Sequence, residues 1–224
     1  AKQRKICVTT STNAHFLDDE TARQTVASGL DALIVSVDGA DQATYETYRV
    51  GGRLNDVLQG IANLVREKAR QQSKTPYLYV QFIAMKHNEH QIGEMKRLCR
   101  AWRVDRLLIK TVQVENVAQA HRWLPSASSL QRYRLSATAL RPKRLVRGPC
   151  HRPWTSSLVN CDGTVVPCCF DKNGTHAFGR IGNGASFEKI WNTSAYDSFR
   201  TKILRERGTL DICANCSQGL RLYL

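Results

Sequence analysis

The sequence predicts an α/β protein followed by a small α+β domain, and three observations support this prediction. Short β-branched apolar runs alternate with amphipathic helical patterns up to about residue 112. The periodicity then fades over residues 114–147, where Pro, Ser and Arg are frequent. The last part contains a turn-forming Asp162-Gly163 pair and two widely separated pairs of cysteines. We therefore expect a first domain over 1–113, a basic connector over 114–147 and a second domain over 148–224.

Four strands and four helices are expected in the first domain. The predicted strands cover residues 6–10, 32–37, 77–83 and 107–109. The strand at 32–37 is a continuous apolar run, which is typical of a strand buried on both faces of a parallel sheet. The predicted helices are a segment at 21–28 capped by Asp18, a short one after Asp41, a long one over 54–65 and one over 92–102. Strands separated by helices predict a right-handed parallel β-α array.

The second domain is expected to combine a hairpin with two helices. Residues 158–160 and 165–167 flank the Asp162-Gly163 turn. Ser186 is expected to cap a short helix, and a longer helix over 196–204 is expected to end before Gly208.

Length and composition restrict the class of protein. The chain has 224 residues with 42% hydrophobic content, which is enough for one ordinary core and a smaller satellite domain. Eight cysteines are too few for a small secreted disulfide scaffold, and neither a signal-like segment nor an apolar run of about 18 residues is present. We therefore expect a soluble, cytoplasmic protein with reduced thiols and no membrane association.

The charge balance favours anionic partners in general. The chain has 33 Lys+Arg and 19 Asp+Glu, a formal net charge of +14. The basic residues are spread along the chain, with one denser stretch over 132–152 that we interpret as a solvated linker face. Since no nucleic-acid motif with interleaved aromatic residues is found, nucleic acid is not an expected partner.

Four cysteines have the spacing of metal ligands. They are Cys150 and Cys168, which the expected hairpin brings together, and the closely spaced pair Cys213 and Cys216. Four thiolates suit an iron-sulfur cluster or a structural zinc ion, and the spacing alone leaves both open. Cys7, Cys99 and Cys161 lack such a setting and are expected to be core or strand residues.

Several motifs in order resemble one family. The segments Cys150-His-Arg-Pro-Trp154, Asn160-Cys-Asp-Gly-Thr-Val-Val-Pro-Cys168-Cys169, Ile190-Trp191-Asn192 and Cys213-x2-Cys216 resemble the SPASM/twitch domain of radical S-adenosylmethionine (radical SAM) enzymes. In the first half, Thr10-Ser-Thr-Asn13 and Ser36-Val-Asp-Gly39 are similar to segments that follow strands of the radical SAM barrel, although Ala14 stands where Gly is usual.

The resemblance implies a fold, cofactors and site residues. It implies a partial (β/α) radical SAM barrel of about four parallel strands, and a small domain in which Cys150, Cys168, Cys213 and Cys216 hold an auxiliary [4Fe-4S] cluster. Because polar residues at the carboxyl ends of barrel strands face the ligand, the expected contacts to S-adenosylmethionine are Thr12, Asn13, Ser36 and Asp38, with Asn88 a weaker candidate. The alternative for each is ordinary loop capping.

The resemblance also implies an activity for the parent protein. It would cleave S-adenosylmethionine reductively to a 5′-deoxyadenosyl radical that abstracts hydrogen from a peptide or a small-molecule, sugar-like or anionic substrate, with electrons from a donor such as flavodoxin or ferredoxin. The Cys-x3-Cys-x2-Cys motif that holds a first [4Fe-4S] cluster in the family does not occur in this sequence. We therefore expect an amino-terminally truncated fragment that is inactive alone and poorly soluble, because its first strand would be an open edge.

Two other interpretations remain open from the sequence. One is a zinc-stabilised, basic nucleic-acid-binding module, and the other is a scaffold that keeps the fold without catalysis. In sulfatase-maturing relatives an Asp that follows the second cluster cysteine acts as a base, whereas Cys169 occupies this position here. This difference argues against the same reaction.

Overall fold

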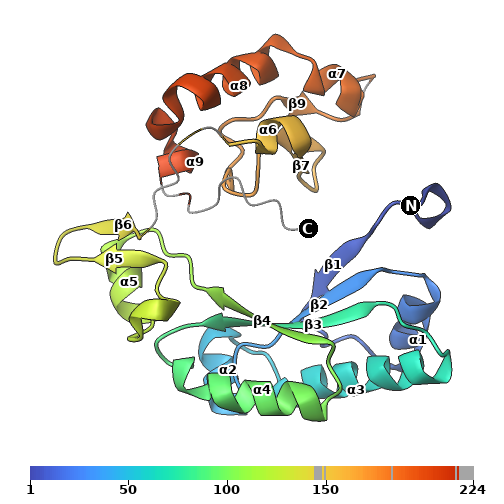
Figure 1. Cartoon of the computed structure of the whole chain (residues 1–224). Helices are drawn as coiled ribbons and strands as arrows, with labels where there is room; N and C mark the ends of the chain where they lie inside the picture. Colours follow the sequence, from blue (N-terminus) through green and yellow to red (C-terminus); the bar gives the residue numbers. More distant parts are fainter. Residues whose placement is uncertain (144–147, 149, 183, 215, 217–224) are drawn as a thin grey trace. The chain divides into compact units, whose positions relative to one another are not determined.

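The structure is a computed structural model that describes residues 1–143, 148, 150–182, 184–214 and 216. The chain divides into two compact units (Figure 1). Unit 1 consists of Ala1–Gln131 with Leu135–Ala139, and unit 2 consists of Arg132–Arg134 with Leu140–Leu224.

Unit 1 contains a four-stranded parallel sheet in the order β1-β2-β3-β4 (Figure 1). The strands are β1 (Thr9–Thr12), β2 (Ala32–Ser36), β3 (Tyr77–Ala84) and β4 (Arg106–Thr111). The predicted α/β class and parallel array are therefore confirmed. β1 begins at Thr9 and not at residue 6, and the backbone amide of Val8 donates to the Asp31 carboxylate at 2.7 Å.

The helices of unit 1 alternate with its strands as predicted. They are α1 (Asp19–Ala27), α2 (Gln42–Tyr48), α3 (Leu54–Arg70), α4 (Ile92–Ala101) and α5 (Val117–Trp123), with short 3-10 turns η1 (Lys2–Arg4), η2 (Glu89–Gln91) and η3 (Ser128–Leu130). The two predicted caps form, because Asp18 accepts from the Thr21 amide and Asp41 from the Thr44 amide, both at 2.8 Å. Each cap satisfies a backbone donor that the first turn of a helix leaves open.

The core of unit 1 lies between the sheet and the helices α1, α3 and α4, which run along the same face of the sheet (Figure 1). Along β3 the exposure alternates: Leu78, Val80 and Phe82 are fully buried, whereas Gln81 is half-buried. In β2, Ile34 and Ser36 are also half-buried. The expectation that residues 32–37 are buried on both faces is therefore wrong, because helices cover one face of this sheet.

Residues 114–143 are more structured than the expected connector. They contain α5 and a two-stranded sheet formed by β5 (Tyr133–Leu135) and β6 (Leu140–Pro142). Trp123 of α5 packs edge-on against the rings of Tyr48 and His87, with centroid distances of 5.7 and 5.6 Å. Elements this short carry too few residues for a periodic signal. Part of the basic stretch, residues 144–147 and 149, lies outside the described residues.

Unit 2 is an α+β unit built on a three-stranded antiparallel sheet in the order β7-β8-β9. Its elements are α6 (Arg152–Thr155), β7 (Leu158–Val159), β8 (Thr164–Val166), β9 (Gly179–Arg180), α7 (Phe187–Trp191), α8 (Ser194–Glu206), η4 (Arg207–Thr209) and α9 (Asp211–Ala214). The predicted hairpin and both predicted helices are confirmed, and β9 is an additional strand. One apolar group joins the sheet to the helices through Val165, Ile190 and Tyr196.

No helix in the described part of the chain combines the length and the apolar character that a membrane span requires.

Candidate functional site

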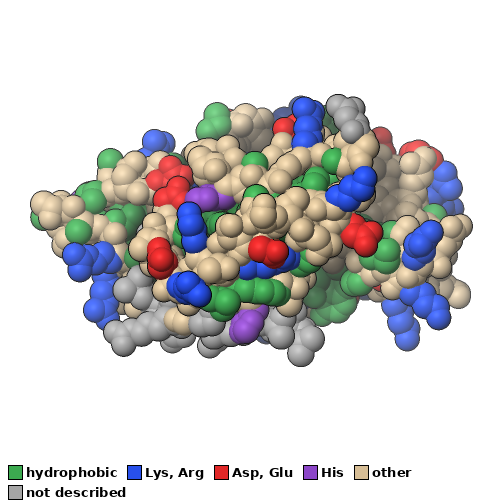
Figure 2. Space-filling model, turned by 90° about the horizontal axis from the view of Figure 1, so that it is seen from above, with side chains coloured by type: hydrophobic (Ala, Val, Ile, Leu, Met, Phe, Trp, Pro, Cys, Tyr) green, Lys and Arg blue, Asp and Glu red, His purple; other side chains and the backbone are tan. Residues whose placement is uncertain are grey.

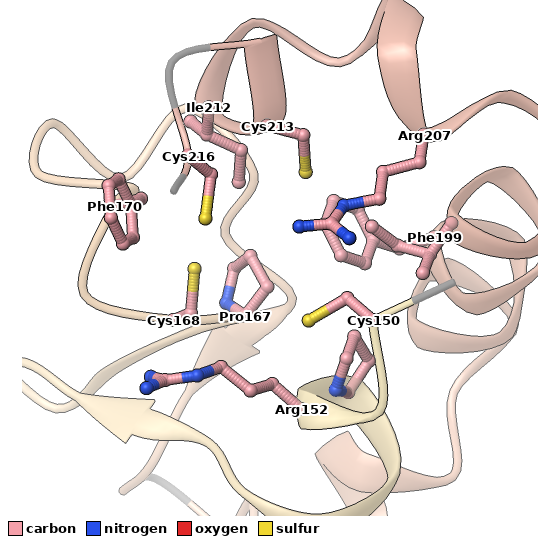
Figure 3. Close-up of a pocket in the computed structure, with 12 residues that line it drawn as sticks. Cys150, Arg152, Pro167, Cys168, Phe170, Phe199, Arg207, Ile212, Cys213 and Cys216 are labelled. Carbon is pink, nitrogen blue, oxygen red and sulfur yellow. The ribbon is translucent and has the colours of Figure 1, made fainter. Parts of the chain in front are cut away.

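Unit 2 contains a pocket lined by all four of the predicted ligand cysteines (Figure 3). We call Cys150, Cys168, Cys213 and Cys216 the four pocket cysteines. Figure 3 shows their sulfur atoms directed into the same space. Residues from the beginning and the end of unit 2, separated by more than 40 positions in the sequence, are thus brought together.

The hairpin turn returns Cys168 to Cys150. Gly163 has a φ of 89° and donates its amide to the Asn160 carbonyl at 2.9 Å, while the Asp162 side chain accepts from the Thr164 amide at 3.0 Å. A Cβ at Gly163 would lie 2.9 Å from the Ile181 carbonyl oxygen, so both the backbone angle and the packing favour glycine here. Cys150 itself is buried beside Phe199 and Ile203 of α8.

The loop that follows Cys168 contacts α9, the helix that carries Cys213. Asp171 is 1% exposed and accepts hydrogen bonds from the amides of Thr175 and His176, which closes the loop. The ring Nε2 of His176 then lies 2.7 Å from the carboxylate of Asp211, the first residue of α9. This contact holds the pKa of Asp211 below its usual value. Asp171, His176 and Asp211 therefore position two of the pocket cysteines.

Sequence reasoning missed these three positioning residues. The turn-rich segment Asp171-Lys-Asn-Gly-Thr175 indicates an Asp-closed loop. No local pattern could pair His176 with Asp211, because the two residues are 35 positions apart.

The rest of the pocket lining is mainly apolar. It comprises Pro153, Pro167, Phe170, Phe199, Ile203 and Ile212, with Arg152 and Arg207. Burial raises the pKa of the Cys168 thiol, and burial also raises the pKa of Cys213 to about 11. Both thiols are therefore protonated at neutral pH, and a metal that binds them has to displace their protons.

The donor set fits a metal held by thiolates. Four sulfur ligands in an apolar surrounding suit an iron-sulfur cluster. Among the residues that the structure describes, no three His, Cys, Asp or Glu side chains are grouped closely enough for a single metal ion.

The other four cysteines have different surroundings. None of the eight cysteines is in a disulfide. Cys99 is buried in the core of unit 1, as predicted, and burial raises its pKa to about 11. Cys7 and Cys161 are exposed and lie outside the strands, so the expectation that they are core or strand residues is wrong. Cys169 is also exposed, and Nη1 of Arg152 lies 3.9 Å from its sulfur.

A second candidate site lies in unit 1, at the carboxyl edge of the parallel sheet. Thr12 is in register with Val35, and Ser36 is in register with Gln81. Thr12, Asn13, Ser36 and Asp38 therefore follow neighbouring strand ends at the same edge. Thr12 and Ser36 are half-buried and Asn13 is exposed, whereas Asp38 is fully buried.

Asp38 is engaged on all sides by the protein. Its Oδ1 accepts from the Ile83 amide at 2.7 Å, and Nη2 of Arg49 lies 2.6 Å from its Oδ2. Burial raises the pKa of Asp38, while the Ile83 amide and the Arg49 guanidinium oppose this rise. The buried Asn88 side chain donates to the Asp38 carbonyl at 2.9 Å and accepts from the Met85 amide at 2.7 Å. Asp38 and Asn88 thereby join the loops after β2 and β3.

The loop after β1 is held by short-range side-chain bonds. The hydroxyl of Thr12 accepts from the Ala14 amide at 3.0 Å, and the Asn13 side chain accepts from the His15 amide at 3.3 Å. Ala14 has a φ of 62°, a left-handed conformation that favours glycine. The position at which Ala14 departs from the family pattern is thus one where the backbone favours the usual Gly.

Charged side chains form no single basic surface on the face seen in Figure 2. Lys and Arg are scattered there, with Asp and Glu between them. Apart from what this view shows, unit 1 contains Arg–carboxylate ion pairs such as Arg49 with Asp38 and Arg70 with Glu67. The scattered charges seen in Figure 2 give no support to a nucleic-acid surface on that face.

Comparison with known proteins identifies the second unit. Residues 150–217 match the SPASM family model, which is described as an iron-sulfur cluster-binding domain. All four pocket cysteines lie within this match. No curated protein has significant sequence similarity to the chain.

Solved structures resemble the chain as a whole. Native anSMEcpe with bound AdoMet and Kp18Cys peptide has 12% sequence identity and a TM-score of 0.59, covering 97% of this chain and 68% of that chain. Native anSMEcpe with bound AdoMet has a TM-score of 0.60 at the same identity and coverage. BtrN in an open conformation has 16% identity over 89% of this chain and 78% of that chain, with a TM-score of 0.30 that is too low to support an argument.

The domain match and the fold together confirm the resemblance stated from the sequence. Residues 150–217 match the SPASM iron-sulfur cluster-binding domain, and the overall fold of the chain is similar to that of native anSMEcpe.

Proposed function

We propose that unit 2 binds an auxiliary [4Fe-4S] cluster through the thiolates of the four pocket cysteines. The observation that carries this proposal is the convergence of four thiols, all within the matched iron-sulfur domain, on one mainly apolar pocket. When bound, the cluster would supply a site for electron transfer or for substrate binding. The protein's part is to hold the thiolates, to exclude water with Phe199 and Ile203, and to fix the ligand segments through His176 and Asp211.

Anaerobic reconstitution with ferrous iron and sulfide tests this proposal. We expect the 224-residue chain to take up about four irons and to develop broad visible absorbance. Cys168→Ser should lower the iron content and the absorbance, because it removes a ligand thiolate. Cys169→Ser is a matched control on the adjacent residue, which does not line the pocket, and should load as fully as the original chain.

Two results would count against a cluster at this site. One is a colourless chain that takes up about one zinc ion in place of iron, which would favour the zinc-stabilised alternative. The other is equal iron loss in the Cys168→Ser and Cys169→Ser chains, because a loss without position dependence would not reflect these four ligands.

For the parent protein we propose radical SAM chemistry. S-adenosylmethionine and a first [4Fe-4S] cluster would supply a 5′-deoxyadenosyl radical for hydrogen abstraction from a peptide or sugar-like substrate, and an external flavodoxin or ferredoxin would donate the electron. The sheet edge of unit 1 supports a role in binding S-adenosylmethionine. Asn13 and Ser36 offer accessible polar groups there, and the hydroxyl of Thr12 can still donate. Asp38, which is fully buried, would act by holding the loops of this edge in place.

A further inference from the structure

Two cations, Arg152 and Arg207, line the thiol pocket with the four pocket cysteines, and Nη1 of Arg152 lies 3.9 Å from the sulfur of Cys169, outside the set of four. Arg207 follows α8, and a chain of backbone hydrogen bonds connects it to two of the cysteines. The Leu210 amide donates to the Arg207 carbonyl at 3.3 Å, the Cys213 amide to the Leu210 carbonyl at 2.9 Å, and the Cys216 amide to the Cys213 carbonyl at 3.1 Å. The chain is extended at Leu210, between η4 and α9, and Arg207, Cys213 and Cys216 all line the pocket.

The guanidinium of Arg207 reaches between two of the thiols. Figure 3 shows it directed into the pocket between Cys150 and Cys213. Its Nη1 donates to the Gly148 carbonyl at 3.1 Å, which fixes its position.

The surroundings strengthen the effect of this charge. The Arg207 side chain is half-buried, and the pocket lining around it includes Phe199, Ile203 and Ile212. In apolar surroundings a charge is screened less than at a solvent-exposed position. Arg205, two residues earlier on α8, is exposed and does not line the pocket.

We propose that Arg207 is a positioning residue that sets the reduction potential of the metal cluster in this pocket. This inference rests on the proposed function of the four pocket cysteines. Reduction adds one electron and therefore one negative charge to an iron-sulfur cluster. A fixed cation beside the ligand sulfurs stabilises the reduced form more than the oxidised form, so it raises the potential. Removing the cation leaves the reduced form less stable and lowers the potential.

Redox titration of the reconstituted full chain tests the inference. The variants are Arg207→Gln, which removes the charge, Arg207→Lys, which keeps it, and Arg205→Gln, which removes an exposed charge two residues earlier, at the end of α8. At a fixed ambient potential we expect the ratio of reduced to oxidised cluster in Arg207→Gln to fall by about tenfold or more, which corresponds to about 59 mV for a one-electron couple. Arg205→Gln should leave the ratio within about twofold of the original chain, and Arg207→Lys should lie between the two.

The remaining outcomes also decide the matter. An unchanged ratio in Arg207→Gln, or an equal change in Arg205→Gln, overturns the inference. If Arg207→Gln fails to load iron while Arg207→Lys loads fully, the positive charge is needed at this position and the inference is supported. If neither loads, the guanidinium serves the Gly148 contact as a structural element and the inference is overturned. Absence of iron in the original chain would instead refute the proposed function itself.

Discussion

Gly60 is the residue at which a single added methyl group should distort the sheet edge of unit 1. It lies in the middle of α3, where the helix passes the loop that carries Asn13. A Cβ at this position would lie 2.6 Å from the Ala14 carbonyl oxygen and 3.0 Å from the Leu17 Cβ, where ordinary contact begins at 3.4 Å. The change to test is therefore Gly60→Ala.

The expected loss follows from two opposing effects. Replacing Gly by Ala inside a helix favours the folded state by about 1 kcal/mol. Overpacking a tight contact costs about 1–3 kcal/mol, and we take about 3 kcal/mol because the nearest atom belongs to the backbone. The loop has little room to move away, since Ala14 is 1% exposed and the Asn63 side chain donates to the Leu17 carbonyl at 3.1 Å. The free energy of unfolding of unit 1 is therefore expected to fall by about 2 kcal/mol in Gly60→Ala.

Gly93→Ala is the matched control. Gly93 lies in α4, and no atom would be within 4 Å of a Cβ added there. Only the preference of Ala over Gly in a helix remains, so the free energy of unfolding of this variant should rise by up to about 1 kcal/mol. The two substitutions are chemically identical, which leaves the contact with the Ala14 loop as the difference between them.

Amide hydrogen exchange of α3 is the appropriate assay, because it measures the opening of unit 1 separately from unit 2. We expect faster exchange in Gly60→Ala, corresponding to the loss of about 2 kcal/mol in opening free energy derived above from the two effects. Equal or slower exchange than in the original chain would refute the reasoning, since it would mean that the loop yields to the methyl group without loss.

Two further predictions concern the same unit. Asp38→Ala leaves the Arg49 cation and the Ile83 amide without their shared partner, so the free energy of opening of unit 1 should fall by about 3 kcal/mol. Hydrogen exchange of β3 measures this change, and a fall of less than about 1 kcal/mol would contradict the prediction. For Asp41, the hydrogen bond from the Thr44 amide lowers the pKa below 3.8. A carboxyl group whose pKa is lowered by folding stabilises the folded state at pH values above its unfolded-state pKa. This contribution to stability is lost as the pH falls through the folded-state pKa. Asp41→Asn keeps a capping side chain without the charge, so its thermal stability should fall less between pH 5 and pH 2, and an identical fall would exclude Asp41 as a source.

Much of the local structure was predictable because its causes are local. Asp18, Asp41 and Ser186 cap the helices that follow them, and each accepts from the backbone amide three residues further along the chain. The Asp162-Gly163 turn likewise forms within its own hairpin. α5 and the pair β5-β6 escaped prediction because they are short, and their packing, such as Trp123 against Tyr48, involves residues far apart in sequence.

The candidate sites, like the fold, have features that could be predicted from the sequence and features that could not. Cysteine spacing and the strand-end polar residues could be read from the sequence, because ligand chemistry and strand order are properties of residue type and position. The sequence could not show whether Asp38 is exposed to a ligand or enclosed by Arg49 and Ile83, because burial depends on elements that meet only after folding.

The sequence by itself determined the class of fold, the parallel β-α arrangement and the four thiols that can bind metal, because periodicity, capping and ligand type depend on neighbouring residues. Only the tertiary structure decided which groups surround those thiols. The contact between His176 and Asp211 and the placement of Arg207 between Cys150 and Cys213 bring together residues far apart in the chain. The physical reason is that these contacts depend on the path of the whole backbone of unit 2, whereas the elements that carry them depend on a few residues each.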